Sequence, residues 1–221
     1  MRTFDEIYDI AAERKGGAEA LETLLSAPRT SEELAAIPSD RWLSAMAKCL
    51  FQAGFNWKVI EAKWSGIEEA FDGFDPVRVA FYHDEDIDRL LSDKRIVRNG
   101  AKVDAVINNA RFILDIEKSA PSVGAFFADW KSDQYVDLLQ LLSKQGSRLG
   151  ALTGQRMLRM MGKNSFLLSP DVVARLVAEG VVDKTPTSKR AMIATQEAFN
   201  IWADQSGRGL TQISQVLAFS V

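Results

Sequence analysis

The sequence has few of the residues from which metal sites and disulfides are built. Its 221 residues include one cysteine, Cys49, and one histidine, His83. A single cysteine cannot form an internal disulfide, which suits a reducing cytoplasm. Together with one histidine it cannot complete a tetrahedral zinc site. We therefore expect a protein without structural disulfide, metal or cofactor.

Long apolar segments are also missing. No uncharged apolar run approaches the roughly 20 residues that a membrane-spanning helix needs. The first 17 residues, MRTFDEIYDIAAERKGG, carry acidic side chains and lack the apolar stretch of a signal peptide. The composition, 47% hydrophobic and 26% charged, is typical of a soluble globular protein. We expect a soluble, cytoplasmic protein that does not contact a membrane.

The net charge of −3 is unevenly spread along the chain. Residues 1–141 have a net charge of −8 and residues 142–221 a net charge of +5. A basic second part suggests that one face meets an anion. Lysine and arginine that merely solvate helices would give the same balance, so charge alone leaves both interpretations open.

Helix signals occur along the whole chain, and no convincing strand pattern accompanies them. Capping residues predict helix starts at Thr3, Thr30, Ser39, Asp75, Ser132 and Ser169. Glycines predict helix ends near Gly16-Gly17, Gly54 and Gly146. Apolar residues in one stretch follow the three-four spacing of a buried helix face: Val103, Val106, Ile107, Ala110, Ile113 and Leu114. We predict an all-α fold of about a dozen helices in a single domain of residues 1–221.

Several large enzyme classes leave no trace in the sequence. It has no Ser–His–Asp arrangement, no phosphate loop of the nucleotide-hydrolase type and no dinucleotide-binding fingerprint. One aromatic residue has an unusual setting, because Trp57 follows a predicted helix break at Gly54 and a restart at Asn56. A loop between helices can present an indole face to a planar ligand. Core packing is the alternative for any tryptophan in a helical stretch.

Two further features are candidates for chemistry. The segment Gly146–Gly150 joins two predicted helices, and its backbone amides can approach a phosphate at the start of the second helix. Arg148, Arg156 and Lys163 lie near it in sequence. Asp171 follows Ser169-Pro170 at a helix start, where it can complement the helix dipole or, in a catalytic role, orient water or stabilise a developing cation.

These features together resemble the type I 3-methyladenine DNA glycosylases, within the helix-hairpin-helix glycosylases. Four motifs in the same order carry the resemblance, which covers roughly residues 43 to 175: Phe51–Trp57 (FQAGFNW), Phe74–Ala80 (FDPVRVA), Arg95–Lys102 followed by Asn109–Arg111, and Leu149–Gly162. The resemblance implies a helix-hairpin-helix element and three segments within the domain. These are divergent N-terminal helices over residues 1–40, a family-like core over 41–180 and C-terminal helices over 181–221.

The resemblance also implies a function, base excision repair on double-stranded DNA that contains alkylated purines such as 3-methyladenine. A monomeric, nucleoid-associated enzyme would flip the damaged base out of the duplex and hydrolyse its N-glycosidic bond. Trp57 matches the stacking tryptophan, with Gln52, Asn56, Cys49 and Phe51 as further base-binding candidates. The DNA-binding candidates are Arg148, Leu149, Gly150, Arg156 and Lys163.

The chain departs from the family pattern at informative places. Cys49 aligns with the family's pocket glutamate, and the family's zinc ligands have no counterparts. Asp171 falls about 20 residues beyond the hairpin glycine, near the place of the catalytic aspartate in the broader superfamily, so we hypothesise that it supplies the missing carboxylate. A non-catalytic DNA-binding or modified-base-binding protein on the same fold is the alternative. A helical protein–protein adaptor explains none of the four motifs.

Overall fold

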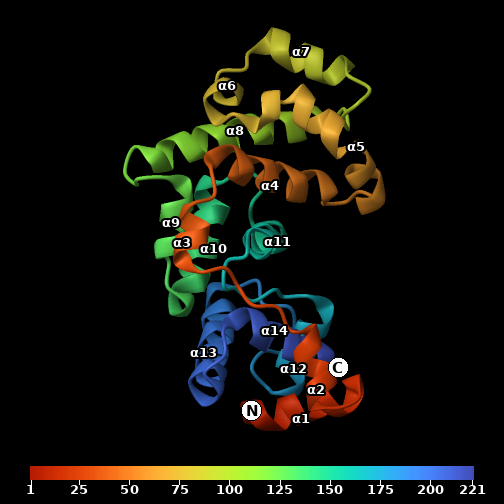
Figure 1. The fold of residues 1–221 in the computed structure, drawn as a ribbon, viewed down its shortest axis with the longest axis vertical. Helices are drawn as coiled ribbons and strands as arrows, with labels where there is room; N and C mark the ends of the chain where they lie inside the picture. The colour runs from red at the N-terminus through yellow and green to blue at the C-terminus, as the bar shows by residue number, and fades with distance from the viewer. The chain divides into compact units, whose positions relative to one another are not determined.

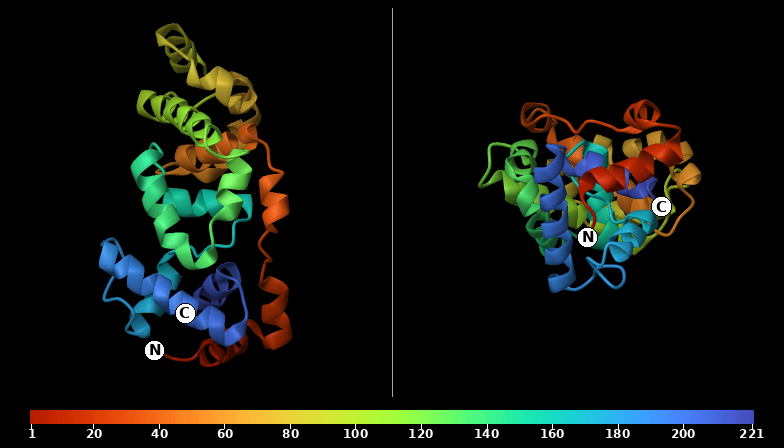
Figure 2. Two further views of the ribbon diagram at one scale, coloured as in Figure 1. Left: turned by 90° about the vertical axis from the view of Figure 1, so that its left-hand side faces the viewer. Right: turned by 90° about the horizontal axis from the view of Figure 1, so that it is seen from below.

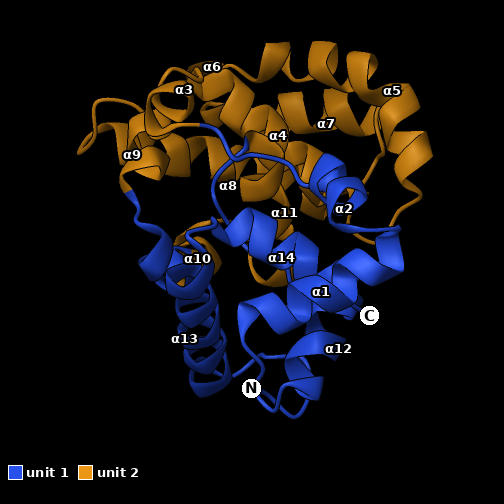
Figure 3. Cartoon of the chain, turned by 60° about the horizontal axis from the view of Figure 1, so that its bottom comes forward, with its two compact units in different colours: residues 1–29, 130–138, 162–221 blue, residues 30–129, 139–161 orange.

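The computed structural model describes residues 1–221, and its regular elements are all helical (Figure 1 and Figure 2). The chain forms two compact units, each built from segments that are distant in sequence (Figure 3). Unit 1 contains residues 1–29, 130–138 and 162–221, and unit 2 contains residues 30–129 and 139–161. The all-α prediction is confirmed, and the expectation of one domain with segments 1–40, 41–180 and 181–221 stays a prediction. None of the helices is both long enough and apolar enough to cross a membrane.

The helices of unit 1 come from both ends of the chain, which Figure 1 shows together in red and blue. They are α1 (Phe4–Lys15), α2 (Ala18–Leu24), α12 (Pro170–Ala178), α13 (Lys189–Ser206), α14 (Leu210–Phe219) and the 3₁₀ helix η2 (Ser132–Gln134). An aromatic core holds them, in which the Phe166 and Phe199 rings stack with centroids 4.4 Å apart. The hydroxyl of Tyr135 donates to the carbonyl of Phe166 at 3.1 Å, which satisfies the one polar atom of that ring.

Unit 2 holds the middle of the chain. Its helices are α3 (Ser31–Ala35), α4 (Ser39–Gln52), α5 (Trp57–Ala70), η1 (Asp72–Phe74), α6 (Pro76–Ala80), α7 (Asp84–Ser92), α8 (Gly100–Glu117), α9 (Val123–Asp129), most of α10 (Tyr135–Gln145) and α11 (Ala151–Met161). The predicted apolar stripe from Val103 to Leu114 lies on α8, and all of its members are buried except Leu114, which is half-buried. This helix packs against α4, α6, α7 and α9, and α11 packs against α4. The long helix α8 and its neighbour α4 therefore contact most of the other helices of unit 2.

The capping signals set most of the helix ends. Thr3 and Thr30 form complete capping boxes, each accepting from the amide of the glutamate three residues on. Such a cap contributes about 1 kcal/mol to helix stability. The Ser169 hydroxyl caps α12 by accepting from the amide of Val172, with Pro170 at the first helical position. α1 ends at Lys15, where Gly16 adopts a φ of 91°, as predicted.

Two predicted helix starts and one predicted end are wrong by a few residues. Ser39 is the first residue of α4 rather than its cap, because Pro38 takes the cap position and the Ser39 hydroxyl donates to Glu117. Ser132 opens the short η2, and α10 begins only at Tyr135. α4 ends at Gln52, before the predicted Gly54.

Candidate functional site

The loop between α4 and α5 presents two aromatic side chains to solvent. Gly54 turns the chain with a φ of 73°, a conformation that glycine adopts without strain. The side chain of Asn56 then accepts from the amide of Lys58 at 3.0 Å and caps α5. α4 ends at Gln52, two residues before the predicted break at Gly54, whereas the restart at Asn56 is as predicted. Trp57 is the first residue of α5, and its side chain is 47% exposed, while Phe55 is 45% exposed.

A buried lysine of α8, Lys102, anchors the loop between α4 and α5 through hydrogen bonds to backbone carbonyls. The ammonium of Lys102 donates to the carbonyls of Phe51 at 3.1 Å and Ala53 at 2.8 Å, and it lies 5.2 Å from the centroid of the Phe55 ring. A cation at these carbonyls complements the negative end of α4. Burial lowers the pKa of Lys102, and the nearby positive charge of Arg148 lowers it further. Sequence reasoning included Lys102 in a family motif but assigned it no role.

The second loop is the α10–α11 hairpin, residues 146–150, and a side chain of the same helix α8 anchors it. Asn109 accepts from the amide of Ser147 at 2.7 Å and donates to its carbonyl at 3.0 Å. Leu149 points inward and is buried. Close packing leaves no room at Gly154, where an added Cβ would lie 2.3 Å from the Leu149 carbonyl oxygen.

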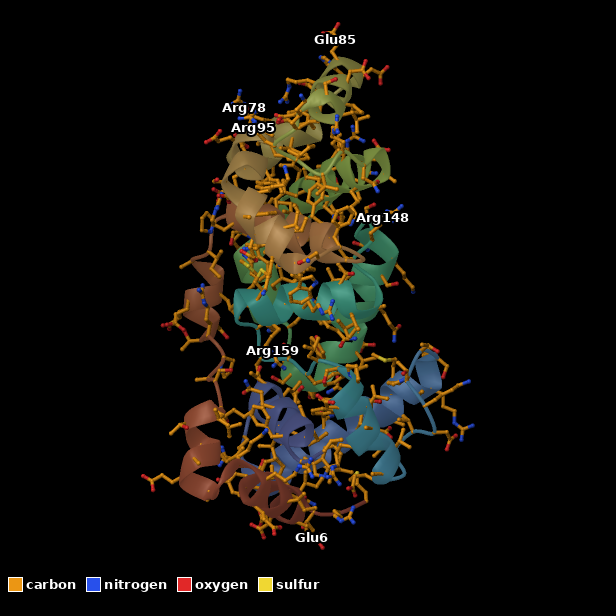
Figure 4. All side chains as sticks on the ribbon, turned by 90° about the vertical axis from the view of Figure 1, so that its right-hand side faces the viewer. Glu6, Arg78, Glu85, Arg95, Arg148 and Arg159 are labelled. Carbon is orange, nitrogen blue, oxygen red and sulfur yellow. The ribbon has the colours of Figure 1, made fainter.

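The hairpin displays its polar groups outward. Arg148 is exposed on this loop, with a φ of 58° that only a tight turn imposes on a residue with a side chain (Figure 4). Gly150 precedes Ala151, the first residue of α11. The first amides of a helix have no partner within the helix and carry the positive end of its dipole. The hairpin thus combines free amides with an exposed guanidinium, a combination suited to an anion.

The two loops meet through α11. The Cζ atom of Arg156, in the second turn of α11, lies 4.9 Å from the centroid of the Trp57 ring. Three predicted site residues, Cys49, Phe51 and Gln52, lie near the end of α4, and their environments differ. Cys49 is buried, and burial raises the pKa of its thiol to about 12 although Arg156 and Lys48 act in the opposite direction. The thiol is therefore neutral near pH 7.

Gln52 and Phe51 complete the α4 part of the site. The amide of Gln52 donates to the Glu61 carboxylate at 3.1 Å, and Lys48 pairs with the same carboxylate at 2.8 Å. Phe51 is fully buried and packs against Phe71 with ring centroids 6.1 Å apart. Its carbonyl bonds to Lys102, but its ring offers no face to a ligand, so we leave Phe51 out of the proposed base contacts.

Two predicted residues lie in the other unit. Lys163 is buried in unit 1, where its ammonium donates to the Trp130 carbonyl at 2.5 Å, and we therefore leave it out of the proposed DNA contacts. Asp171 is exposed in the first turn of α12, after the cap in which the Ser169 hydroxyl accepts from the Val172 amide at 3.3 Å. That position is favourable for a carboxylate because of the helix dipole. A catalytic role for Asp171 stays a prediction.

The candidate site contains no cluster of metal-ligating side chains. No three histidine, cysteine, aspartate or glutamate side chains are grouped as metal ligands, so the chain does not fit the zinc site of the family it resembles. A hollow of about 660 Å³ belongs to α13 of unit 1, and no predicted site residue lines it. Its lining residues are Lys189, Arg190, Ile193, Ala194 and Glu197.

The helical fold with its hairpin is that of the helix-hairpin-helix DNA glycosylases. The 8-oxoguanine glycosylase/lyase of Methanocaldococcus jannaschii, solved in complex with DNA, matches 97% of this chain and 96% of its own with a TM-score of 0.58 at 12% identity, a likeness of fold alone. Within this class, the sequence model of the methyladenine glycosylase family matches residues 40–182. The chain belongs to that family.

Individual relatives agree with the family match. The 3-methyladenine DNA glycosylase I of Staphylococcus aureus, whose structure describes 3-methyladenine recognition, matches 57% of this chain and 77% of its own at 28% identity, with a TM-score of 0.50. DNA-3-methyladenine glycosylase 1 of Escherichia coli is 40% identical over 68 residues, or 31% of this chain and 36% of that protein. The Haemophilus influenzae DNA-3-methyladenine glycosylase is 33% identical over 75 residues, or 40% of its length. This chain thus matches well under half the length of these curated relatives.

Proposed function

We propose that this protein is a DNA glycosylase that hydrolyses the N-glycosidic bond of alkylated purines, such as 3-methyladenine, in double-stranded DNA. One observation carries the proposal beyond family membership. A single helix, α8, anchors both the loop that exposes Trp57, through Lys102, and the hairpin with its free amides, through Asn109. A base-binding ring and a phosphate-binding loop on one rigid frame are what base flipping requires, since the enzyme must hold the backbone while it extrudes the base.

The site residues then divide between base and backbone. Trp57 stacks on the extruded base. Asn56 and Gln52 contact the edge of the base, and Cys49 contributes an uncharged side chain next to it. On the DNA backbone, Arg148 pairs with a phosphate while the amides after Leu149 and at Gly150 bind it by the helix dipole. Phosphate contacts fix the position of the protein on the duplex, and the ring selects the lesion.

The chemistry needs little acid catalysis for a methylated base. A methyl group at N3 of adenine makes the base a cation in DNA, and it departs as a neutral molecule once the bond to the sugar breaks. Water adds to the sugar carbon and loses a proton, so the products are free base and an abasic site. We further propose that the Asp171 carboxylate orients that water and stabilises the positive charge that develops on the sugar.

A second function has one observation in its favour. Cys49 is neutral, and the Glu61 carboxylate, which contacts this end of α4, is already bonded to Lys48 and Gln52. A protein that recognises a modified base on this fold without cleaving its bond would need no free carboxylate. Both functions use DNA, and we further infer that the protein acts as a monomer on nucleoid DNA in the cytoplasm.

Base release distinguishes the two functions. Methylated duplex DNA is incubated with the parent protein and with Asp171→Asn, and released bases are identified by mass spectrometry. Asp204→Asn, which alters an exposed carboxylate of α13 in the same unit, is the matched control. We expect the parent and Asp204→Asn to release 3-methyladenine and Asp171→Asn to release at least tenfold less. Salt-sensitive DNA binding without release of any base would instead establish the binding protein.

A further inference from the structure

Helix α5 carries a carboxylate one turn beyond Trp57. Glu61 follows Trp57 by four residues, so the two side chains lie on the same face of the helix with Cβ atoms about 5–6 Å apart. Helical side chains lean towards the N-terminus of their helix, so that of Glu61 leans towards the turn that carries the indole ring. The side chain of Glu61 is 53% exposed. A half-exposed carboxylate therefore lies one turn from the ring on which the proposed function stacks a purine.

Two side chains of α4 fix the position of this carboxylate. The Gln52 amide donates to Oε1 of Glu61 at 3.1 Å, and the ammonium of Lys48 lies 2.8 Å from Oε2. Gln52 is buried and is the last residue of α4, directly before the loop that leads to Trp57. The carboxylate is thus held where α4, the loop and α5 meet.

The fixed carboxylate keeps part of its capacity to accept hydrogen bonds. Each carboxylate oxygen has two lone pairs, and the contacts with Gln52 and Lys48 occupy one on each oxygen. The remaining lone pairs belong to a half-exposed group. Glu61 can therefore accept from an N–H donor of a ligand without losing its contacts with α4.

The other groups around the ring are positive or neutral. The Cζ atom of Arg156 lies 4.9 Å from the centroid of the Trp57 ring, and Lys48 adds a second positive charge. The Cys49 thiol is neutral, because burial raises its pKa to about 12. Glu61 is the one carboxylate bonded to the second half of α4. A positively charged ligand on this ring is repelled by Arg156, so Glu61 is the group that can offset the repulsion.

Alkylated and unmodified adenine differ in the strength of one donor. Methylation of a ring nitrogen makes the base a cation in DNA, and the exocyclic amino group keeps its two N–H donors. A hydrogen bond between charged partners is roughly twice as strong as one between neutral partners. Unmodified adenine has the same amino group without the charge. A carboxylate one turn from the ring therefore binds the alkylated base more strongly than the normal one.

We propose that Glu61 is a specificity-determining residue whose carboxylate accepts from the exocyclic amino group of a positively charged purine stacked on Trp57, and so favours the alkylated base over unmodified adenine. This inference rests on the proposed function, because it assumes that the base stacks on Trp57. It gives Glu61 a part in recognition and none in proton transfer, so the proposed role of Asp171 at the sugar is unchanged.

Single-turnover release of 3-methyladenine from methylated duplex DNA tests the proposal. Glu61→Gln removes the charge and keeps the shape of the side chain. We expect it to lower the rate at saturating protein about 10- to 100-fold, the size of one hydrogen bond to a charged group. Glu69→Gln is the matched control, because Glu69 is an exposed carboxylate of the same helix that pairs with Arg95 at 2.9 Å. It should stay within about twofold of the parent. An unchanged rate in Glu61→Gln overturns the proposal.

Lys48→Met separates recognition from a purely structural role of the ion pair. It breaks the same ion pair as Glu61→Gln but leaves the carboxylate in place, without its competing cation. If Glu61 binds the base, Lys48→Met should release 3-methyladenine at least as fast as the parent. Equal losses in Lys48→Met and Glu61→Gln would mean that the pair only holds α4 against α5, and they would overturn the specificity role.

A binding measurement keeps the inference separate from catalysis. If the parent releases no base, the proposed function fails, and quenching of tryptophan fluorescence by nucleosides then decides the role of Glu61. The probes are 1-methyladenosine at pH 6, where it is a cation, and adenosine, with Trp57→Phe identifying the signal of Trp57. The ratio of the affinity for the cation to that for adenosine should fall about tenfold in Glu61→Gln and stay constant in Glu69→Gln. Equal ratios in the parent and Glu61→Gln, or no quenching of Trp57 by either nucleoside, would refute the proposal.

Discussion

The two units have similar charge although the sequence is divided by charge. Unit 1 holds 11 basic and 13 acidic residues, and unit 2 holds 16 and 17. Along the chain, by contrast, the net charge changes from −8 over residues 1–141 to +5 over residues 142–221. Each unit combines segments from both parts of the chain, so the imbalance disappears on folding. Charge along a sequence is thus a poor guide to the charge of a folded unit.

The two units differ in the hydrogen-bond partners of their buried polar side chains. In unit 1, Glu179 accepts from Arg2 at 2.8 Å and from Arg175 at 3.2 Å, and Arg175 also bonds to Ser220, so the charges close on one another. In unit 2, the side chains of Lys102 and Asn109 form hydrogen bonds with the backbone of loops that face solvent. The first arrangement contributes to stability, and the second orients a surface.

The largest expected effect is on the stability of unit 1. Glu179→Ala leaves Arg175 buried without its carboxylate, which should cost about 3 kcal/mol of unfolding free energy in urea titration. Glu19→Ala on exposed α2 is the control. Burial acts to raise the pKa of Glu179, but the bonds from Arg2 and Arg175 outweigh it and lower the pKa. The folded state therefore favours the charged carboxylate, and the difference between parent and variant should shrink as the pH falls below about 4.5.

Trp57→Ala should have the opposite profile, a large loss of function with little loss of stability. Stacking of one base on an aromatic ring contributes about 1–3 kcal/mol, so we expect base release at subsaturating DNA to fall about 10- to 100-fold. The ring is half exposed, so the urea midpoint should barely change. Trp57→Phe, which keeps an aromatic face, should recover most of the loss. A variant that unfolds more easily but releases base normally would make Trp57 a packing residue.

The sequence predicted local features well and connections between distant residues poorly. The capping boxes at Thr3 and Thr30 and the helix restart at Asn56 depend on residues within a turn of one another, and the structure confirms them. Ser39 fails as a cap because its hydroxyl bonds to Glu117, 78 residues away. Rules based on local sequence predict hydrogen bonds within a turn, but they cannot predict bonds between residues that are distant in the sequence.

In the candidate site, too, the sequence predicts local features but not contacts between distant residues. Exposure of Trp57 on an interhelical loop could be predicted, since a broken helix must leave its first residues near solvent. The anchoring of that loop by Lys102 spans 51 residues, and the contact of Arg156 with Trp57 joins α11 to α5. Only the packing of α4 against α8 and α11 brings these groups together. Lys163 shows the reverse, a basic residue close to the hairpin in sequence whose ammonium is bound to a carbonyl of unit 1.

Asn109→Ala tests whether the hairpin depends on α8. It removes both hydrogen bonds to Ser147 and leaves two backbone groups without partners, which should cost about 1–2 kcal/mol of stability. We expect duplex binding, measured by fluorescence anisotropy, to weaken about tenfold because the amides at 149–151 lose their fixed direction. Asn108→Ala, at the exposed neighbouring position, is the control. Unchanged DNA binding in folded Asn109→Ala would separate the hairpin from DNA.

Cys49 gives unit 2 an expected sensitivity to alkali. Burial raises the pKa of its thiol from 9.0 to about 12, so the folded state keeps its proton where the unfolded chain loses it. The stabilisation is complete below pH 9 and is lost as the pH rises towards 12. Between pH 8 and pH 10 the parent should lose about 1.4 kcal/mol more than Cys49→Ala in urea titrations. Parallel losses in the two proteins would mean that the thiol ionises freely in the folded state.

The smallest expected effect concerns the single exposed guanidinium of the hairpin. If Arg148 neutralises one phosphate, Arg148→Ala should reduce the slope of log affinity against log salt by about 0.9, with a modest loss of affinity that is equal for damaged and undamaged duplexes. Arg95→Ala is the control, since Arg95 is already paired with Asp93 at 2.7 Å and Glu69 at 2.9 Å. A slope that stays constant in Arg148→Ala would mean that the hairpin meets DNA through its amides alone. In that case unit 2 would differ from unit 1 only in the two loops whose backbones α8 anchors, and the charge of Arg148 would make no contribution to DNA binding.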